Sequence, residues 1–331
     1  MAVKPHAAAL RDLRDRVEVV AAYSPTEARR AAFAADWPDF PLTDRLEDAL
    51  TAPGVEAVLI LTPPNTHLDL VARAAAAGKH VLLEKPLEVA TDRAEALVAA
   101  CAQAGVTLGV VLQHRFRPAA EKLRDLLDEG ALGAVLGCST AIRLWRPQSY
   151  YDEPGRGTLA RDGGGVLMTQ GIHTLDLMLS LAGPVAEATG YVATTAAHRM
   201  ETEDMACAAV RFASGALGVI DATTAACPGF PERIDLACAQ GSARLEGTGL
   251  TVAFADGRRL DLAPDVGPGG TGADPMAFSH AAHRAVIADF ASAVRSGRPP
   301  RVSGAEALRV HRLIDALIET GRSGRPVLLP S

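Results

Sequence analysis

The stretch HVLLEKP at residues 80–86 decides the fold. Its apolar run predicts a buried strand, and Pro86 must end that strand because proline has no backbone N–H to donate to a neighbour. Lysine is almost never fully buried unless it is paired. We therefore expect Lys85 at the carboxyl edge of the strand, where ligands bind in open α/β sheets.

The segments around this stretch alternate between short apolar runs and helix-like runs from residue 17 to about residue 117. Continuous apolar strands that alternate with helices predict βαβ units and a parallel sheet. We expect strands at 17–22, 55–62, 80–83 and 106–112, and helices at 26–35, 42–50, 67–77 and 90–104.

The pattern changes after Pro118. Runs of strands without intervening helices predict an antiparallel sheet. We expect strands at 135–145 and throughout 185–262, with hairpin turns at 214–215 and 256–257. The expected helices are 119–129, 166–181, 278–296 and 304–320, and the Gly/Pro/Asp-rich residues 263–275 predict a loop. The 331 residues are enough for two domains, which we place at 1–117 and 118–331.

Composition excludes several classes of function. The net charge of −6 and the pI of about 5.9 give no basic surface for nucleic acid. The apolar runs are far shorter than the ~20 residues of a membrane helix, and the first residues have no signal-peptide pattern, so we expect a cytoplasmic protein. The five cysteines include no Cys-x-x-Cys pair, so we expect reduced thiols, with neither disulfides nor a metal site.

Lys85 permits two interpretations. It is either a solvated strand-end charge that Glu84 neutralises, or a catalytic group that binds a substrate hydroxyl and lowers its pKa. Lysine suits the second role because burial and neighbouring charges readily shift its own pKa.

A second polar group surrounds the glycines at 163–165, which allow close backbone approach. If 166–181 is an α-helix, Thr169 and His173 share one face, as do Gln170, His173 and Asp176. A histidine is the usual general acid or base near neutral pH. The alternative is a core histidine that Asp176 satisfies.

Further polar residues precede those glycines. They form either a surface loop or the rim of a substrate site, in which aromatic rings stack on a sugar and arginines bind hydroxyls or carboxylates. The candidates are Arg143, Trp145, Arg146, Tyr150, Tyr151 and Arg156. Asn65 and His67 likewise either begin a helix or line a cofactor at the carboxyl edge of the strand at 55–62.

Taken together, these segments resemble the Gfo/Idh/MocA family of NAD(P)-dependent sugar and polyol oxidoreductases. The resemblance covers nearly the whole chain and rests on an ordered set of motifs: TPPNTH at 62–67, EKP at 84–86, QHRFRP at 113–118, GGG at 163–165, QGIH at 170–173 with Asp176, and GRP at 324–326.

The resemblance implies a Rossmann-type dinucleotide-binding domain and a substrate-binding and oligomerisation domain with an open, mainly antiparallel sheet. It implies that Lys85 and His173 are catalytic. By position, the cofactor would be lined by Thr62, Pro63, Asn65, His67, Glu84, Lys85 and Gln113. The expected substrate-binding residues are Thr169, Gln170, Arg143, Arg156 and Tyr150.

The chain departs from the family pattern at two places. The usual Asp four residues before His173 is Thr169, which supplies no carboxylate. A family member also begins with a strand and a Gly-x-Gly-x-x-Gly turn. When this sequence is aligned with that pattern, Met1 corresponds to the position just after the second glycine, and Val3 takes the place of the third. We expect a truncated first strand; either the start is wrongly assigned, or cofactor binding is impaired.

The cofactor type depends on the residues after the strand at 17–22, where an acidic residue normally binds the ribose 2′-OH. Ser24 with Arg29 or Arg30 favours a 2′-phosphate and therefore NADP, whereas Glu27 leaves NAD possible.

The sequence thus predicts hydride transfer between NAD(P) and a secondary alcohol or ketone of a sugar, inositol or related polyol. The alternative is a non-catalytic sugar- or dinucleotide-binding protein on the same scaffold, which Thr169 and the absent glycine turn favour. Because an open antiparallel sheet commonly buries its free face against another subunit, we expect a homodimer or homotetramer through the C-terminal sheet.

Overall fold

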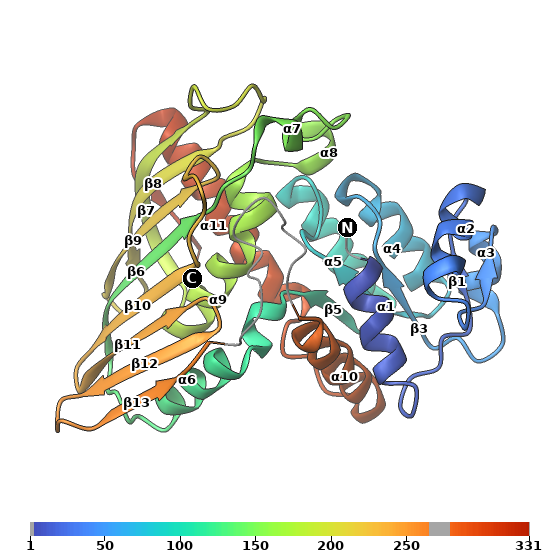
Figure 1. The fold of residues 1–331 in the computed structure, drawn as a ribbon, viewed down its shortest axis with the longest axis horizontal. Coiled ribbons are helices and arrows are strands. Elements are labelled where there is room, and N and C mark those ends of the chain that lie inside the picture. Colours follow the sequence, from blue (N-terminus) through green and yellow to red (C-terminus); the bar gives the residue numbers. More distant parts are fainter. Residues whose placement is uncertain (1–2, 265–278, 331) are drawn as a thin grey trace. The chain divides into compact units, whose positions relative to one another are not determined.

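The structure is a computed structural model that describes residues 3–264 and 279–330. The chain forms two compact units (Figure 1). Unit 1 comprises Met1–Glu88, Asp92–Val111 and His280–Ala305, and unit 2 comprises Val89–Thr91, Leu112–Ser279 and Glu306–Ser331. The chain thus leaves unit 1 close to the boundary expected at residue 117 and returns to it for residues 280–305. That residues 1–117 and 118–331 are separate functional domains stays a prediction.

Unit 1 is an α/β unit with two parallel sheets. Its helices are α1 (Val3–Asp12), α2 (Glu27–Asp36), α3 (Leu46–Thr51), α4 (His67–Ala76), α5 (Thr91–Gln103) and α10 (Ala281–Ser296). Its strands are β1 (Ala22–Tyr23), β2 (Leu42–Thr43), β3 (Ala57–Ile60), β4 (His80–Glu84) and β5 (Leu108–Val111). The larger sheet has the order β3-β4-β5, and the smaller one pairs β1 with β2.

Strand β4 is the centre of the larger sheet. Leu82 lies opposite Leu59 on β3 and Gly109 on β5. The side chains from Val81 to Leu83 are fully enclosed, as expected for a parallel strand covered on both faces. Helix α4 packs against β3 and β4, α10 packs against β4 and β5, and α1 packs against α10. The carboxyl end of β4 is therefore held by elements from three parts of the sequence.

Two expectations for this unit need correction. The segment 42–50 does not form one helix: Thr43 pairs with Tyr23, its hydroxyl accepts the Arg45 N–H at 3.2 Å, and the helix begins only at Leu46. The strand expected at 17–22 is reduced to Ala22–Tyr23. Among the described residues no strand precedes α1, and β1 and β3 belong to separate sheets.

Unit 2 contains a nine-stranded, mainly antiparallel sheet in the order β13-β12-β11-β10-β6-β9-β8-β7-β14. Its strands are β6 (Val135–Arg143), β7 (Val185–Ala193), β8 (Met205–Phe212), β9 (Leu217–Thr223), β10 (Arg233–Cys238), β11 (Gly241–Glu246), β12 (Gly249–Phe254), β13 (Arg259–Leu262) and β14 (Val327–Leu328). Its helices are α6 (Pro118–Asp128), α7 (Gln148–Tyr151), α8 (Leu159–Asp162), α9 (Ile172–Ala182) and most of α11 (Gly304–Ser323).

Helices cover one face of this sheet, with α9 against β6 and β10 and α6 against β11 and β12. The two predicted hairpins are present, with Gly215 and Gly257 at positive φ between β8 and β9 and between β12 and β13. The sheet strands alternate between buried and exposed side chains, which is the pattern of a sheet with one covered face. The loop expected at 263–275 lies almost wholly outside the described residues.

The helix expected at 166–181 is not a regular α-helix. It begins with a π-helical turn, η3 (Leu167–Gly171), and continues as α9 from Ile172. Such turns are rare and occur often at functional sites. The assumption that Thr169 and His173 lie one α-helical turn apart therefore does not hold.

Candidate active site

The carboxyl end of β4 carries Glu84 and Lys85. Glu84 is buried, its Oε2 accepts the Lys85 backbone N–H at 2.9 Å, and its Oε1 lies 2.8 Å from His6 Nε2. Burial works to raise the pKa of Glu84, but the hydrogen bond from His6 and the charge of Lys85 outweigh burial, so the pKa lies below its ordinary value. Glu84 is thus a buried carboxylate that fixes the backbone of the half-buried Lys85.

His67 joins the loops that follow β3 and β4. Its side chain is buried, with Nε2 2.9 Å from the carbonyl of Thr62 and Nδ1 3.1 Å from the carbonyls of Pro86 and Leu87. Both ring nitrogens therefore face the backbone. This arrangement gives His67 a positioning role between the two loops.

The loop after β3 contains the other cofactor candidates of this edge. Thr62, Pro63 and Asn65 are exposed, and the hydroxyl of Thr66 donates to the Pro63 carbonyl at 2.8 Å. The short helix η1 (Pro64–Thr66) fixes the loop immediately before α4. These side chains are accessible to a ligand at the carboxyl end of β3.

Ser24 and Arg29, the candidates for the adenosine end of the cofactor, differ in their surroundings. Ser24 follows β1, and its carbonyl accepts a hydrogen bond from Arg30 Nη1 at 2.7 Å. Arg29 is exposed on α2. Arg30, rather than Arg29, is therefore the arginine that the structure brings to Ser24.

In unit 2, the glycines at 163–165 approach the backbone of other segments. Gly163 has φ +74°, and an added Cβ would lie 2.6 Å from Val89 backbone atoms. An added Cβ at Gly165 would lie 1.7 Å from the carbonyl oxygen of Glu203. No side chain fits at either position, so these glycines are required by close packing.

Glu203 holds the start of the π-helical turn. Its carboxylate accepts the N–H groups of Gly165 at 3.0 Å and Leu167 at 3.1 Å. Burial raises the pKa of Glu203, although these N–H bonds act to lower it. Because its partners are 38 and 36 residues away in the chain, no local sequence signal indicates this role.

His173 stacks on a second histidine. The rings of His114 and His173 lie 4.8 Å apart at an interplanar angle of 29°. His114 is buried, with Nδ1 3.8 Å from Glu232 Oε2. Gln113, which precedes it in the helical turn η2 (Gln113–Phe116), has a buried Oε1 without a hydrogen-bond partner among the described residues.

Asp176 does not satisfy His173, contrary to the alternative interpretation of the sequence. Its two oxygens accept hydrogen bonds from Arg115 Nε at 2.7 Å and Nη2 at 2.6 Å, and Arg115 Nη1 donates to Glu306 at 3.2 Å. Burial disfavours the charge of Arg115, but Asp176 and Glu306 outweigh it and raise the arginine pKa. Arg115, in the QHRFRP motif at 113–118, thus binds Asp176 and Glu306. The sequence indicates the motif but not this role of Arg115.

Four of the predicted substrate residues form one hydrogen-bonded group. The Thr169 hydroxyl donates to the Gly165 carbonyl at 2.7 Å and also contacts Gln170 Oε1. Gln170 Nε2 lies 3.5 Å from the Tyr150 hydroxyl, which accepts a hydrogen bond from Arg156 Nη1 at 2.9 Å. The Arg156 guanidinium also lies over the Tyr150 ring, 4.3 Å from its centroid.

Arg143 does not join this group. It belongs to the exposed positions of β6, whereas the neighbouring Ile142 is buried, and it pairs with Asp221 on β9 at 3.3 Å. Strand alternation therefore places Arg143 on the opposite face of the sheet from Ile142. Its expected role in substrate binding is not supported by this placement.

The residues present fit a dinucleotide cofactor in part. The exposed loop after β3 offers polar groups at the carboxyl edge of a parallel sheet, where such ligands bind. Among the described residues no glycine turn precedes α1, so no group for the pyrophosphate is assigned.

Comparisons with known proteins agree with this arrangement. The NAD-binding Rossmann-fold model of the oxidoreductase family matches residues 1–112, and the GFO/IDH/MocA C-terminal domain model matches residues 120–244. The chain is 30% identical over 346 residues to D-apiose dehydrogenase of Paraburkholderia graminis, covering 98% of this chain and 86% of that protein. It is 27% identical over 290 residues to scyllo-inositol 2-dehydrogenase (NAD(+)) of Bacillus subtilis, covering 85% of this chain and 80% of that protein.

Solved structures show the same fold. The WlbA dehydrogenase from Bordetella pertussis, crystallised with NADH and UDP-GlcNAcA, is 28% identical, has a TM-score of 0.82, and is matched over 99% of this chain and 95% of that chain. Both the α/β unit with its parallel sheets and the unit with the large antiparallel sheet therefore follow a known pattern. The chain belongs to the Gfo/Idh/MocA family of oxidoreductases.

Proposed function

We propose that this protein transfers a hydride between NAD(P) and a secondary alcohol or ketone of a sugar, inositol or related polyol. The observation that carries the proposal is Lys85, a half-buried lysine held at the carboxyl end of the central strand β4 by Glu84. The names of the relatives support the substrate class, since they include an apiose dehydrogenase and an inositol dehydrogenase.

Each catalytic residue has a distinct role in this proposal. A bound nicotinamide supplies the hydride acceptor or donor. Lys85 donates a hydrogen bond to the substrate hydroxyl and favours its deprotonated form, because a cation close to an acid lowers the acid's pKa. His173 accepts the hydroxyl proton in the oxidative direction and returns it in the reverse direction. Thr169 has no carboxylate that could balance the charge of a protonated His173. The ring of His114 stacks on the ring of His173.

The group formed by Gln170, Tyr150 and Arg156 supports a polyhydroxylated substrate. It offers an amide, a phenol hydroxyl and a guanidinium, which together donate to and accept from hydroxyl groups. Arg156 is preorganised by its contacts with Tyr150 and with Glu153 at 2.9 Å, so little side-chain entropy is lost when it binds a ligand.

Cofactor preference follows from the end of β1. The Arg30 guanidinium at Ser24 favours a 2′-phosphate, so we infer that NADP is accepted, with NAD as the alternative. The relative kcat/KM for NADP⁺ and NAD⁺ tests this inference, and Arg30→Ala should lower the value for NADP⁺ more than for NAD⁺.

We place the protein in the cytoplasm as a homo-oligomer. All five cysteines are free, which supports a reducing compartment. Among the described residues no helix is both long and apolar enough to cross a membrane. Leu217, Val219 and Tyr191 are exposed on the nine-stranded sheet, which supports self-association.

The first experiment follows absorbance at 340 nm over a panel of sugars, inositols and polyols with NAD⁺ and NADP⁺. On the best substrate, Lys85→Ala and His173→Ala should each lower kcat by about 10²–10⁴-fold, the usual contribution of positioned acid–base groups. Lys79→Ala, a lysine whose Nζ bonds to the Val55 carbonyl at 2.8 Å, is the matched control and should retain activity. Wild-type turnover in either variant contradicts the assigned role, and ligand binding without turnover across the panel favours a non-catalytic binding protein.

A further inference from the structure

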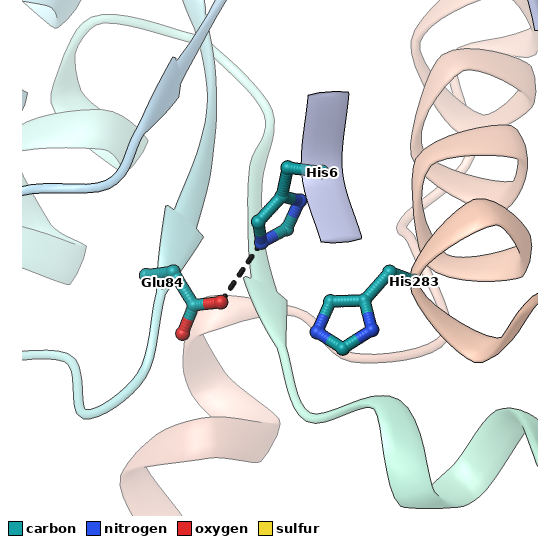
Figure 2. A group of neighbouring side chains, drawn as sticks. All are labelled: His6, Glu84 and His283. Atoms are coloured by element: carbon teal, nitrogen blue, oxygen red, sulfur yellow. Dashed lines mark hydrogen bonds and ion pairs between the residues drawn. The ribbon is translucent and has the colours of Figure 1, made fainter. Parts of the chain in front are cut away.

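Three buried side chains of unit 1 meet at one point. His6 lies on α1, Glu84 ends β4 and His283 lies on α10, and Figure 2 shows both rings turned toward the carboxylate. Their exposed fractions are only 1%, 8% and 3%. One ligand atom from each residue lies within 4.8 Å of the other two. Side chains from three distant parts of the sequence thus bring two imidazoles and a carboxylate to one point.

The donor set matches one class of ligand. Two histidines and a glutamate, with a fourth position open to water, form a known zinc coordination set. Imidazole nitrogens also bind Co²⁺ and Ni²⁺, whereas Ca²⁺ and Mg²⁺ require six or more oxygen ligands. Glu84 contributes the carboxylate of this donor set.

His6 presents one ring nitrogen to the cluster. Its Nδ1 is buried and has no hydrogen-bond partner among the described residues, although its Nε2 is bonded to Glu84. Nε2 is therefore the His6 atom available to an ion at this point, and Nδ1 lies on the other side of the ring. A hydrogen-bonded His–Glu pair alone does not require a second imidazole, yet His283 lies edge-on to His6 with ring centroids 5.0 Å apart.

The geometry requires only a small adjustment to hold an ion. Ligand atoms about 2.0–2.2 Å from a tetrahedral ion lie about 3.3–3.5 Å from one another. The longest separation allowed here, 4.8 Å, therefore has to shorten by side-chain rotation of roughly 1 Å or more.

We propose that His6, Glu84 and His283 form a binding site for one divalent transition-metal ion, Zn²⁺ or Co²⁺, within unit 1. The ion ties α1 and α10 to the carboxyl end of β4. This site does not depend on the proposed hydride transfer, and its test needs neither substrate nor cofactor.

The test uses the full-length protein after treatment with a chelator. Co²⁺ is added while visible absorption is recorded, Zn²⁺ is used to displace it, and equilibrium dialysis measures the stoichiometry. We expect one ion per chain, visible absorption typical of four-coordinate Co²⁺, and a rise in Tm of several degrees with Zn²⁺. His283→Gln and Glu84→Gln should each weaken binding by more than ~100-fold, because even outer-shell partners of a metal site are worth about 10–100-fold.

Two matched variants distinguish this site from other histidines. His280 and Asp12 form an exposed pair 2.9 Å apart that offers weak surface binding, so His280→Gln should leave the affinity unchanged. His311→Gln removes another buried histidine and should also have no effect. If His280→Gln lost as much affinity as His283→Gln, the ion would be bound at the surface pair instead, and the proposal would be wrong.

A replacement ligand separates lost coordination from lost folding. His283→Cys keeps a metal-binding side chain at the same position, so it should bind Co²⁺ and add a sulfur-to-cobalt absorption band in the near ultraviolet. The metal-free variants are compared by circular dichroism and thermal unfolding. The proposal is wrong if the wild-type protein retains no ion after dialysis, if His283→Gln binds as tightly as wild type, or if His283→Cys shows no sulfur band.

Discussion

At the scale of single residues, the position of Lys85 depends on a carboxylate that the sequence alone does not distinguish from a surface charge. Glu84 is adjacent to Lys85 in the motif, and the sequence presents it either as the charge that neutralises Lys85 or as a cofactor contact. In the structure it is buried and bonded on one side to His6 and on the other to the Lys85 backbone. Its charge state therefore contributes to the stability of unit 1.

Glu84 should make stability depend on acid pH. Its pKa in the folded protein lies below the ordinary value, so its contribution is present above about pH 4.3 and is lost as pH falls through the folded pKa. Glu203, whose pKa is raised by burial, acts in the opposite direction, because its unfolded form ionises first as pH rises. We expect Glu84→Gln to weaken the loss of stability on acidification.

The measurement is urea unfolding at pH values from 3.5 to 7 in the presence of a chelator. The exposed Glu129→Gln is the control and should follow the wild-type curve. An unchanged pH dependence in Glu84→Gln would mean that the buried carboxylate does not carry this effect.

The motifs were identified from the sequence because they are local. EKP follows an apolar run and ends it with proline, and QGIH follows glycines, so Lys85 and His173 could be singled out without a structure. The partners of those motifs could not be predicted. Glu203 and His283 contact residues 36 to 277 positions away, and periodicity carries no information about such pairs. The same limit explains why Arg143 was grouped with Tyr150, although strand alternation places it on another face.

At the scale of elements, the start of α9 is shaped by a close approach between two backbones. Gly165 lies so close to Glu203 that an added Cβ would overlap the Glu203 carbonyl, 1.7 Å away. The same Glu203 carboxylate accepts the N–H groups that begin the π-helical turn. Packing and hydrogen bonding thus fix the turn that carries Thr169 and leads to His173.

Gly165→Ala should therefore destabilise unit 2 by more than the ~1–3 kcal/mol typical of overpacked sites, because the obstacle is backbone rather than a flexible side chain. Denaturant unfolding measures the loss. Gly137→Ala on β6 is the matched control, since its nearest atom would be a carbonyl oxygen 3.5 Å away, an ordinary contact. Similar stability of the two variants would contradict the close approach.

The pairing of Arg115 with Asp176 connects the η2 turn to α9. Asp176 is fully buried, so loss of the arginine leaves an uncompensated charge. Arg115→Met should cost about 3–5 kcal/mol of unfolding free energy. The double variant Arg115→Met/Asp176→Leu should recover much of that loss, because both charges are then absent. A double variant as unstable as the single one would show that the ion pair is not the cause.

At the scale of the whole molecule, the sequence predicts the order of helices and strands better than it predicts which of them belong to the same unit. Alternation of strands and helices before residue 117, and successive strands after residue 185, are visible as hydrophobic patterns, and both sheet types were confirmed. The return of α10 to unit 1 was not visible, because an amphipathic helix carries no mark of which sheet it covers. It packs on β4 and β5, whose buried faces lie about 170 to 200 residues earlier in the chain.

The face of the large sheet away from α9 exposes several large apolar side chains. The strand register aligns Val219 on β9 with Ala209 on β8, and Tyr191 on β7 with Cys207 on β8. Val219 is 51% exposed, Leu217 on the same strand is 58% exposed and Tyr191 is 80% exposed. Exposed apolar side chains on one face of a sheet favour an interaction site, and here they alternate with charged residues such as Arg211 opposite Leu217 and Asp221 opposite Cys207. A second copy of the chain fits because an isologous contact pairs the surface with itself.

Val219→Lys should therefore shift the protein from oligomer to monomer, because a lysine opposite the same lysine of a second copy places like charges in the contact. Each chain should stay folded, because an exposed strand position tolerates lysine. Light scattering coupled to gel filtration measures the mass, and thermal unfolding confirms the fold. Leu159→Lys on α8 exchanges an exposed leucine away from the sheet and should leave the oligomer intact. A monomeric wild type, or a Val219→Lys variant of wild-type mass, would exclude this face as the subunit interface.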